Sequence, residues 1–349
     1  MKRFAFNTLL VLLFSAILNT NSTQSQSFPT PVSYLNFLGK QQEKINKDFW
    51  DYTSSIAHSN NARKVENRRV DLIKTTLEAI NNISKIPDYN GDASLRDSMV
   101  SFLKINYYLL TEDFAKLVNM EEIAEQSFDD MEAYMMAKDK ANQKLEIASE
   151  RLTAIVDKFA KDNQITIIEN ADKVTQKLII AGKAFTYYNP IYLLFFKSYK
   201  QEAYLLDALK NNDFVALEQS RKKLAEITTT DIKSVDIIQG FKNDYSVKNA
   251  CKQLISFYNL EATKKIPIIT DFYLKKETFE KIKADVDSKM EMTRTKEDIE
   301  NYNKALTEYN KSINEYNRTI KELNDNRSRL ITNWNNAVVG FLDRHIPKK

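Results

Sequence analysis

The sequence contains few residues that turn or interrupt a polypeptide chain. Only five glycines and six prolines occur in 349 residues. Sheet proteins and loop-rich proteins use these residues at their many turns, whereas helix interiors exclude them. Apolar residues make up 43% of the chain and charged residues 28%, which suits apolar cores with charged outer faces. The composition therefore predicts an all-α protein that is long enough for two domains.

Cysteine and histidine are also scarce. Cys251 is the only cysteine, so no internal disulfide can form, and its spacing from Leu254 and Ile255 is typical of a small core residue. The two histidines, His58 and His345, have no acidic or cysteine neighbours at metal-ligand spacing. We expect both histidines at the surface near helix ends. The sequence thus predicts no catalytic, metal-binding or cofactor-binding residue of these types.

Familiar catalytic patterns are missing from the sequence. It has no glycine-rich phosphate loop and no G-x-S-x-G segment. The segment 88–92 is polar like a calcium loop, but Gly91 stands at its fourth position and Met99 at its twelfth. An EF-hand needs glycine at the sixth position and glutamate at the twelfth. Carboxylates are numerous, yet no pair stands out from charged helix faces. We therefore expect that the protein is not an enzyme.

Neither sign of charge dominates the sequence. Lysine and arginine total 51 against 47 acidic residues, and no basic stripe of the kind that binds nucleic acid is evident. Lys2 and Arg3 begin a separate N-terminal pattern, because an apolar run (4–18) and a small polar stretch (19–26) follow them. This order is typical of a secretory signal peptide, and the run is short for a membrane span.

We therefore interpret residues 1–26 as a signal peptide that is cleaved between Thr20 and Gln26. The alternative is an uncleaved N-terminal anchor. No cysteine lies near the end of this segment to carry a lipid. The protein is expected to be exported to the periplasm or the cell surface, and not as a lipoprotein.

Residues 297–342 contain the most regular pattern in the chain. Apolar residues recur at every seventh position and again four positions later, at Tyr302, Tyr309, Tyr316, Leu323 and Leu330 and at Leu306, Ile313, Ile320 and Trp334. Alternating steps of four and three place one apolar seam along a long helix. We interpret the tyrosines as seam residues whose hydroxyls lie at the rim. Binding of glycans or haem by this aromatic row is the alternative.

The remaining pattern divides the chain into two helical units. We assign residues 27–161 to a first four-helix-bundle-like unit, with helices over about 33–59 and 62–83, a third from a Ser94 cap, and a fourth that reaches Phe159. The start of the fourth helix is open between a cap at Asn119 and one at Ser127. Residues 162–189 are interpreted as a connector, in which a short helix (171–182) ends before a break at Pro190. Residues 190–349 form the second bundle-like unit.

The second half repeats the pattern of the first. Four pairs of segments match in the same order: Tyr34 with Tyr192, Asn60 with Asn211, Asp92–Asp97 with Asp244–Asn249, and Ala154 with Ala337. This order indicates an internal duplication, and the alternative is a chance likeness of two four-helix units. The offset grows from about 150 to about 183 residues, so the second copy has roughly 30 extra residues in its last helical hairpin.

These extra residues predict an antiparallel coiled-coil hairpin over about 268–343. Its first arm begins after Pro267 and carries an apolar seam of Phe272, Phe279, Ile282 and Val286. Thr295, with Asp298 three positions later, is predicted to cap the last helix. The base of the hairpin, at Trp334 and Phe341, is expected to pack in the core of the second bundle. The candidate interaction residues lie at the tip: Met292, Arg294, Thr295, Lys296 and Glu297.

The second half resembles an uncharacterised family of helical bacterial surface proteins, known mainly from spirochaetes and bacteroidetes. The resemblance is carried by the segments Tyr187–Lys197, Lys200–Asp207, Asn249–Leu254, Arg294–Asp298, Tyr302–Lys304 and Trp334–Pro347. The first half is similar more loosely, through Pro87–Asp92 and the helix after it. The resemblance implies a helical fold, export and surface exposure, and it implies no activity.

We expect a non-enzymatic, exported interaction protein whose hairpin contacts an unknown protein or envelope component. One alternative is a membrane-active helical protein, which the mixed charges of the hairpin disfavour. Another is a carrier that holds a small ligand between helices. Pairing of two chains through the heptad seam is a further option for its oligomeric state.

Overall fold

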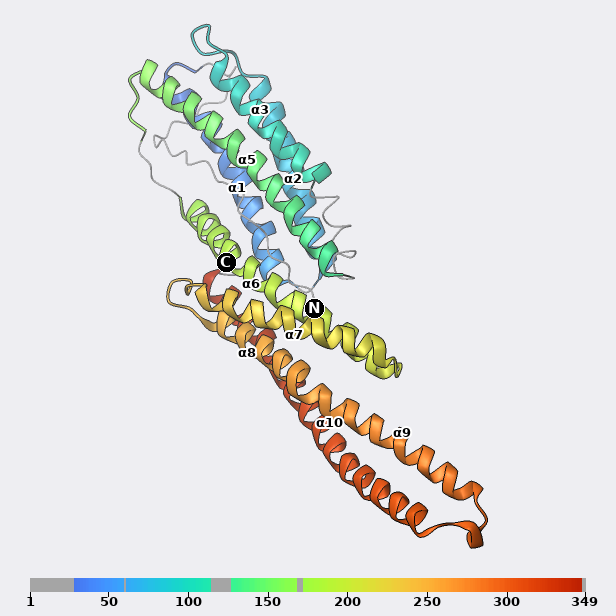
Figure 1. The fold of residues 1–349 in the computed structure, drawn as a ribbon. Helices are drawn as coiled ribbons and strands as arrows, with labels where there is room; N and C mark the ends of the chain where they lie inside the picture. Colours follow the sequence, from blue (N-terminus) through green and yellow to red (C-terminus); the bar gives the residue numbers. More distant parts are fainter. Residues whose placement is uncertain (1–27, 60, 114–126, 168–171, 347–349) are drawn as a thin grey trace. The chain divides into compact units, whose positions relative to one another are not determined.

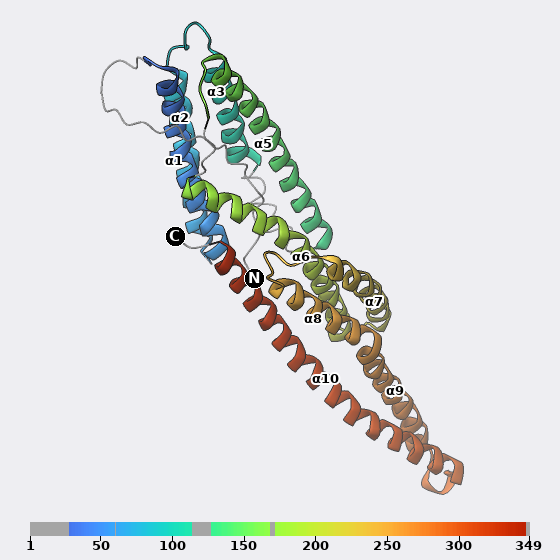
Figure 2. The ribbon, with the colours of Figure 1, turned by 90° about the vertical axis from the view of Figure 1, so that its left-hand side faces the viewer.

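The computed structural model describes residues 28–59, 61–113, 127–167 and 172–346, and within these ranges the protein is all-α (Figures 1 and 2). The only extended pairings among these residues are two isolated bridges, Tyr89 with Asp92 and Phe241 with Asp244. The helices are α1 (Pro31–His58), α2 (Ala62–Ser84), α3 (Ser94–Tyr108), η1 (Leu109–Asp113), α5 (Phe128–Asp162), α6 (Lys173–Lys210), α7 (Phe214–Ile237), α8 (Ser246–Leu260), η2 (Glu261–Lys265), α9 (Ile266–Ser288), η3 (Glu291–Thr293) and α10 (Lys296–His345).

The chain divides into two compact units, Met1–Pro190 with Val339–Lys349, and Ile191–Val338. In unit 1, α1 packs against α2, α2 against α3, and α3 against α5, and the four helices lie side by side (Figure 1). In unit 2, α7 packs against α8 and η2. The helices α9 and α10 run side by side and extend beyond α7 and α8 (Figure 2). Sequence patterns placed residues 339–349 in the second unit, whereas the contacts of residues 339–346 group them with the first.

Aromatic side chains in the core of unit 1 hold the turn between α2 and α3 in place. Tyr34 is fully buried, and its ring packs against Phe28 at 4.9 Å, Tyr89 at 5.4 Å and Phe159 at 5.9 Å between ring centroids. Its hydroxyl donates a hydrogen bond to the Pro87 carbonyl at 3.1 Å. Burial of large aromatic side chains contributes about 1.5–3 kcal/mol each. The turn after α2 is therefore fixed to the end of α5 by aromatic packing.

Helix caps test the predicted boundaries directly. Ser127 caps α5, because its hydroxyl accepts the Asp130 amide at 3.1 Å, which confirms one of the two predicted starts. The other start, at Asn119, lies outside the described residues, as does the predicted signal peptide. The prediction that Ser94 caps α3 is wrong. Ser94 is the first helical residue, and the Asp92 carboxylate accepts its amide at 2.7 Å.

The predicted helix break at Pro190 is also wrong, since α6 runs without interruption from Lys173 to Lys210. Proline inside a helix costs about 3 kcal/mol, because it removes one hydrogen bond and its ring crowds the preceding turn. Tyr188 and Ile191 on either side of Pro190 are nevertheless buried, each contributing about 1.5–3 kcal/mol. Burial therefore outweighs the local preference of proline, and the predicted short helix (171–182) is the first part of a long one.

Pro267 likewise does not begin a separate arm. Helix continues from α8 through η2 into α9, and within this stretch the Ile266 amide bonds to the Glu261 carbonyl five residues back. This π-helical turn replaces the regular spacing of four residues. Pro267 follows it in the first turn of α9, where proline lacks no bond that the helix requires. The first arm of the hairpin is thus a direct extension of α8.

Local features recur at a constant offset of 152 residues. The turn pairs Tyr89 with Asp92 and Phe241 with Asp244, and each aspartate accepts the amide of the serine two residues later. The positive-φ residues Asn90 and Lys242 are a further pair at this offset, and so are the π-helices η1 and η2. The ion pairs Glu66–Arg69 and Glu218–Arg221 also match. Their arginines donate in the same way to the Leu110 and Ala262 carbonyls. Such agreement in bonding detail supports the predicted duplication.

The structure also changes the register of the predicted duplication. Asn61 and Asp213 are equivalent N-caps, so the predicted match of Asn60 with Asn211 is one residue out of register, and that of Tyr34 with Tyr192 is six residues out. The ends of α5 and α10, at Asp162 and His345, lie 183 residues apart. The second copy therefore has 31 additional residues after η2, and they lengthen its hairpin.

Replacing Gly91 with valine is expected to destabilise unit 1 by about 1–2 kcal/mol, since a β-branched residue strains a left-handed backbone conformation. Gly91 has φ +83°, and Asn243 occupies the equivalent position at φ +64°. Asparagine tolerates this region, so Gly91→Asn should change stability little. Urea unfolding followed by fluorescence measures both variants, with Trp334→Phe as background so that Trp50 in unit 1 is the only tryptophan. Equal losses in the two variants would contradict this account of the turn.

Candidate interaction surface on the long hairpin

The hairpin, defined here as residues 266–322, is held together by stacked aromatic rings. Phe272 stacks on Tyr316 with ring centroids 4.3 Å apart, and Phe279 stacks on Tyr309 at 5.1 Å. Phe279 also contacts Tyr302 at 5.6 Å. Offset stacking of this kind is worth about 0.5–1.5 kcal/mol per pair beyond the buried area. The heptad tyrosines therefore join the two arms of the same chain, as the sequence predicts.

In the outer part of the hairpin, the most buried residues of the α10 seam are small and polar. Ser312 and Thr319, seven residues apart, are almost completely buried, whereas Leu306, Ile313 and Ile320 are half-buried. Short side chains let two helices approach closely, and the long apolar side chains then pack at the flanks. The seam was predicted from its long residues, but its centre is made of short ones. The hydroxyl of Ser312 donates to the Tyr309 carbonyl, so its polarity is satisfied within α10.

The turn at the tip is fixed by charged and polar groups. Arg294 donates from Nε to the Val286 carbonyl at 3.1 Å, and Lys289 pairs with both Asp285 and Asp298 at 2.8 Å. Thr295 and Asp298 form the predicted cap of α10, with each side chain accepting the other's amide. The hydrogen bond from Lys289, with help from the Thr295 amide, lowers the pKa of Asp298 to about 2. The Asp298 carboxylate thus stays ionised at physiological pH and accepts from both Lys289 and the Thr295 amide.

This fixed turn presents apolar and charged side chains outward. Met292 in η3 is 94% exposed and Met290 is 77% exposed, with Ile299 partly exposed nearby in sequence. Lys296 pairs with Glu300 at 3.5 Å across an exposed helix face, and Glu297 is also exposed. Of the predicted tip residues, Arg294 and Thr295 therefore maintain the turn, whereas Met292, Lys296 and Glu297 are available for contact.

The base of the hairpin helix contributes to two different cores. Trp334 is buried in unit 2 and stacks on Phe195 with ring centroids 4.4 Å apart. Phe341 is buried in unit 1, where its ring lies 5.4 Å from that of Tyr187. The prediction that both residues pack in the second unit is correct for Trp334 and wrong for Phe341, because seven further residues carry α10 past the boundary between the units.

The rare histidine and cysteine residues have structural surroundings. The His58 side chain is only 8% exposed, and its Nδ1 lies 2.9 Å from a carboxylate oxygen of Asp343, so the predicted surface position is wrong. His345 lies against the Phe341 ring. Cys251 is completely buried, as predicted, and burial raises the pKa of its thiol far above the ordinary value. A thiol in this state is a poor nucleophile.

A cluster of buried charges in unit 2 was missed in the sequence. Arg327 on α10 binds Glu202 on α6 through Nε at 2.5 Å and Glu261 in η2 through Nη2 at 2.5 Å. Both carboxyl groups are buried. In the sequence, Glu202 and Glu261 look like ordinary residues of charged helix faces, because ion pairs between distant residues leave no local pattern. The repeat does contain a signal, since Glu202 and Glu261 correspond to Trp50 and Leu109 at the offset of 152 residues.

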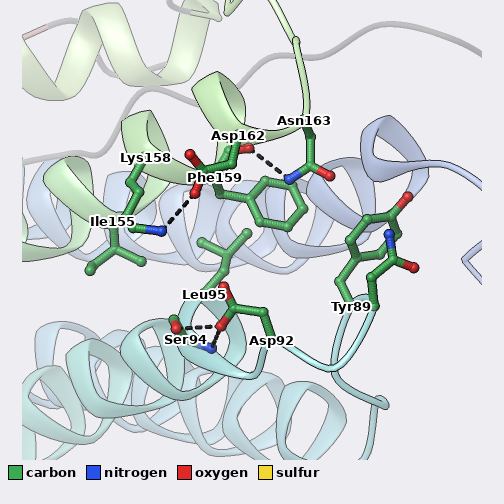
Figure 3. A pocket seen from close by; sticks show the side chains of 10 residues that line it. Tyr89, Asp92, Ser94, Leu95, Ile155, Lys158, Phe159, Asp162 and Asn163 are labelled. Carbon is green, nitrogen blue, oxygen red and sulfur yellow. Dashed lines mark hydrogen bonds and ion pairs between the residues drawn. The ribbon is translucent and has the colours of Figure 1, made fainter.

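A shallow hollow of about 180 Å³ lies beside the turn of unit 1 (Figure 3). Its polar lining groups already bond to one another: Lys158 pairs with Asp162 at 2.6 Å, and Asp92 accepts the Ser94 amide. Pockets for small organic ligands have volumes of roughly 300–1,000 Å³ and keep polar groups free for the ligand. This hollow therefore adds no support to the ligand-carrier alternative.

No group of three or more His, Cys, Asp or Glu side chains among the described residues is arranged to hold a metal ion. None of the described helices is both long enough and apolar enough to cross a membrane.

Comparison of the sequence with protein-family models and with curated proteins, and of the fold with solved structures, finds no match. The resemblance to helical bacterial surface proteins therefore stays a prediction, and the function must be argued from the geometry of this chain alone.

Proposed function

We propose that the protein is a non-enzymatic, exported interaction protein and that the tip of its hairpin contacts a protein or envelope component of the cell surface or periplasm. The observation that carries the proposal is the length difference between the two repeats. The second repeat has 31 residues more than the first, and they extend a hairpin whose long seam residues Leu306, Ile313 and Ile320 are only half-buried. A helical unit of this kind does not need such an extension to form its own core, as the first repeat illustrates.

The construction of the tip supports a binding role. Arg294, Lys289 and Asp298 fix the turn through side-chain bonds, while Met290 and Met292 remain exposed. A fixed turn loses little conformational entropy when a partner binds, so more of the contact energy appears as affinity. Exposed methionines adapt to the shape of an apolar partner surface. The mixed charges around them favour a protein partner over a lipid surface.

A photoreactive amino acid at position 292, introduced into the full chain in its native cells, is expected to yield a covalent adduct of one defined mass. The matched control is position 237, because Ile237 on α7 is 78% exposed yet lies outside the hairpin. The same probe there should give no such adduct. Adducts of equal yield at both positions, or none at position 292, would contradict a binding role for the tip.

A second variant tests whether the hairpin is separable from the core of unit 2. Deleting residues 272–278 together with 310–316 removes one heptad from each arm and leaves Phe279 opposite Tyr309. The remaining seam stays in register, so we expect unchanged mean helicity by circular dichroism and unchanged Trp334 fluorescence. Unfolding of unit 2 in this variant would show that the extension serves stability instead.

A further inference from the structure

The buried cluster of Glu202, Glu261 and Arg327 has an unbalanced set of charges. Two carboxyl groups share one guanidinium, and the exposed fractions of Glu202 and Glu261 are 2% and 0%. One oxygen of Glu261, Oε2, has no hydrogen-bond partner. Three buried charges with one positive member leave a net negative charge unless one carboxyl group keeps its proton. A buried unpaired charge is far more costly than a neutral carboxyl group.

The first repeat shows that the fold does not require these charges. Trp50 and Leu109 occupy the positions equivalent to Glu202 and Glu261, and both are buried in unit 1. Apolar side chains of this kind stabilise a core without desolvating a charge, and replacing buried ion pairs with them is often neutral or stabilising. The acidic residues in unit 2 therefore need an explanation other than stability.

Within the part of the chain that the structure describes, the neighbouring titratable groups supply no second positive charge. From α8, Tyr258 is fully buried beside the cluster, and burial with the nearby charge of Glu202 raises the pKa of its hydroxyl. From α6, the same two causes raise the pKa of Tyr199. Arg221 on α7 is paired with Glu218, and Lys265 in η2 is paired with Glu322 of α10. Arg327 thus remains the cation that faces both carboxyl groups.

We propose that Glu202, Glu261 and Arg327 form a proton-dependent clamp at the base of the hairpin. In neutral and acidic surroundings, a proton on Glu261 leaves one carboxylate on the guanidinium and holds α6, η2 and α10 together. Loss of that proton in alkaline surroundings leaves two carboxylates on one guanidinium and loosens their attachment. The cluster is a regulatory device of unit 2, and its action does not depend on whether the tip of the hairpin binds a partner.

The direction of the pH effect follows from the titration of Glu261. Burial, followed by the charge of Glu202, raises its pKa to about 8, and Arg327 only partly opposes this. An unfolded glutamate has a pKa of about 4.3. Between these values the folded state binds more protons than the unfolded state, so stability is greatest below the unfolded pKa and falls as pH rises to about 8. Above that value the contribution of Glu261 no longer changes.

Urea unfolding of the full chain tests the clamp, with Trp50→Phe as background so that Trp334 in unit 2 is the only tryptophan. With Glu261 present, we expect the unfolding equilibrium constant to rise by up to tenfold per pH unit between about pH 5 and pH 8. Glu261→Gln should remove this rise. Buried Asp231 also has a raised pKa, but it is common to both chains and cancels in their difference.

The matched control is Glu322→Gln, because Glu322 lies at the surface of α10 and pairs with Lys265. This variant should keep the pH dependence of the parent. If Glu261→Gln does not fold, Glu261→Leu provides the side chain found at position 109 and should likewise abolish the dependence. A pH profile of either folded variant that matches the parent, or a parent profile that is flat from pH 5 to pH 8, would overturn the proposal.

Discussion

Replacing Arg327 with methionine is expected to destabilise unit 2 by about 3–5 kcal/mol at pH 7. Methionine keeps much of the apolar stem of arginine but removes the guanidinium that binds Glu202 and Glu261. Both carboxyl groups then lie in the core without a cation, which is the most costly arrangement of buried charge. Urea unfolding followed by Trp334 fluorescence measures the loss. It should be smaller at pH 5, because burial raises the pKa of Glu261 and its protonated form carries no charge.

Two further variants identify the cause of this loss. Arg329→Met changes an exposed arginine that bonds to the Asn326 side chain at 3.1 Å, and it should alter stability by less than about 0.5 kcal/mol. The triple variant Glu202→Leu, Glu261→Leu and Arg327→Met removes all three charges together. It should recover most of the lost stability, because no buried charge of this cluster then remains. If the triple variant were as unstable as Arg327→Met, lost packing rather than unpaired charge would be the cause.

Replacing Phe195 with alanine is expected to cost about 3–5 kcal/mol of unit 2 stability. Phe195 is buried, and its ring stacks on Trp334 at 4.4 Å and on Tyr199 at 5.5 Å. Truncation loses the transfer free energy of the ring and leaves a cavity that the neighbouring aromatic rings cannot fill. The Trp334 emission should shift to longer wavelength in the folded state, because water gains access to the indole.

Phe214→Ala is the matched control for this truncation. Phe214 is partly exposed at the start of α7, although its ring also contacts an aromatic neighbour, Tyr273, at 5.0 Å. Loss of a partly exposed ring should cost no more than about 1 kcal/mol. Similar losses for Phe195 and Phe214 would mean that the base of the hairpin is not the tightly packed core described above.

Helices with a clear local pattern were predictable from the sequence. The apolar stripe of α1 and the heptads of α10 depend on spacing within one helix, and the caps at Ser127 and Thr295 depend on side chains three residues apart. The duplicated turn was predictable for the same reason, since Asp92–Asp97 and Asp244–Asn249 share a short polar motif. In each case the deciding interaction lies within a few residues along the chain.

Predictions failed where distant residues decide the structure. Local preference favours a break at Pro190, but buried neighbours keep α6 continuous. His58 reads as a surface residue, yet Asp343, far along the chain, pairs with it. The candidate tip was predicted as one group, whereas contacts with Val286 and Asp298 divide it into residues that hold the turn and residues that are exposed.

The sequence by itself determined the all-α class, the heptad seam and the extra length of the second hairpin, because hydrophobic periodicity and repeat offset are properties of the chain alone. Only the tertiary structure decided that residues 339–346 belong with unit 1 and that Glu202, Glu261 and Arg327 meet in the core of unit 2. The free energy of a buried charge depends on the partners and the solvent around it, and these are fixed only when helices distant in sequence pack together.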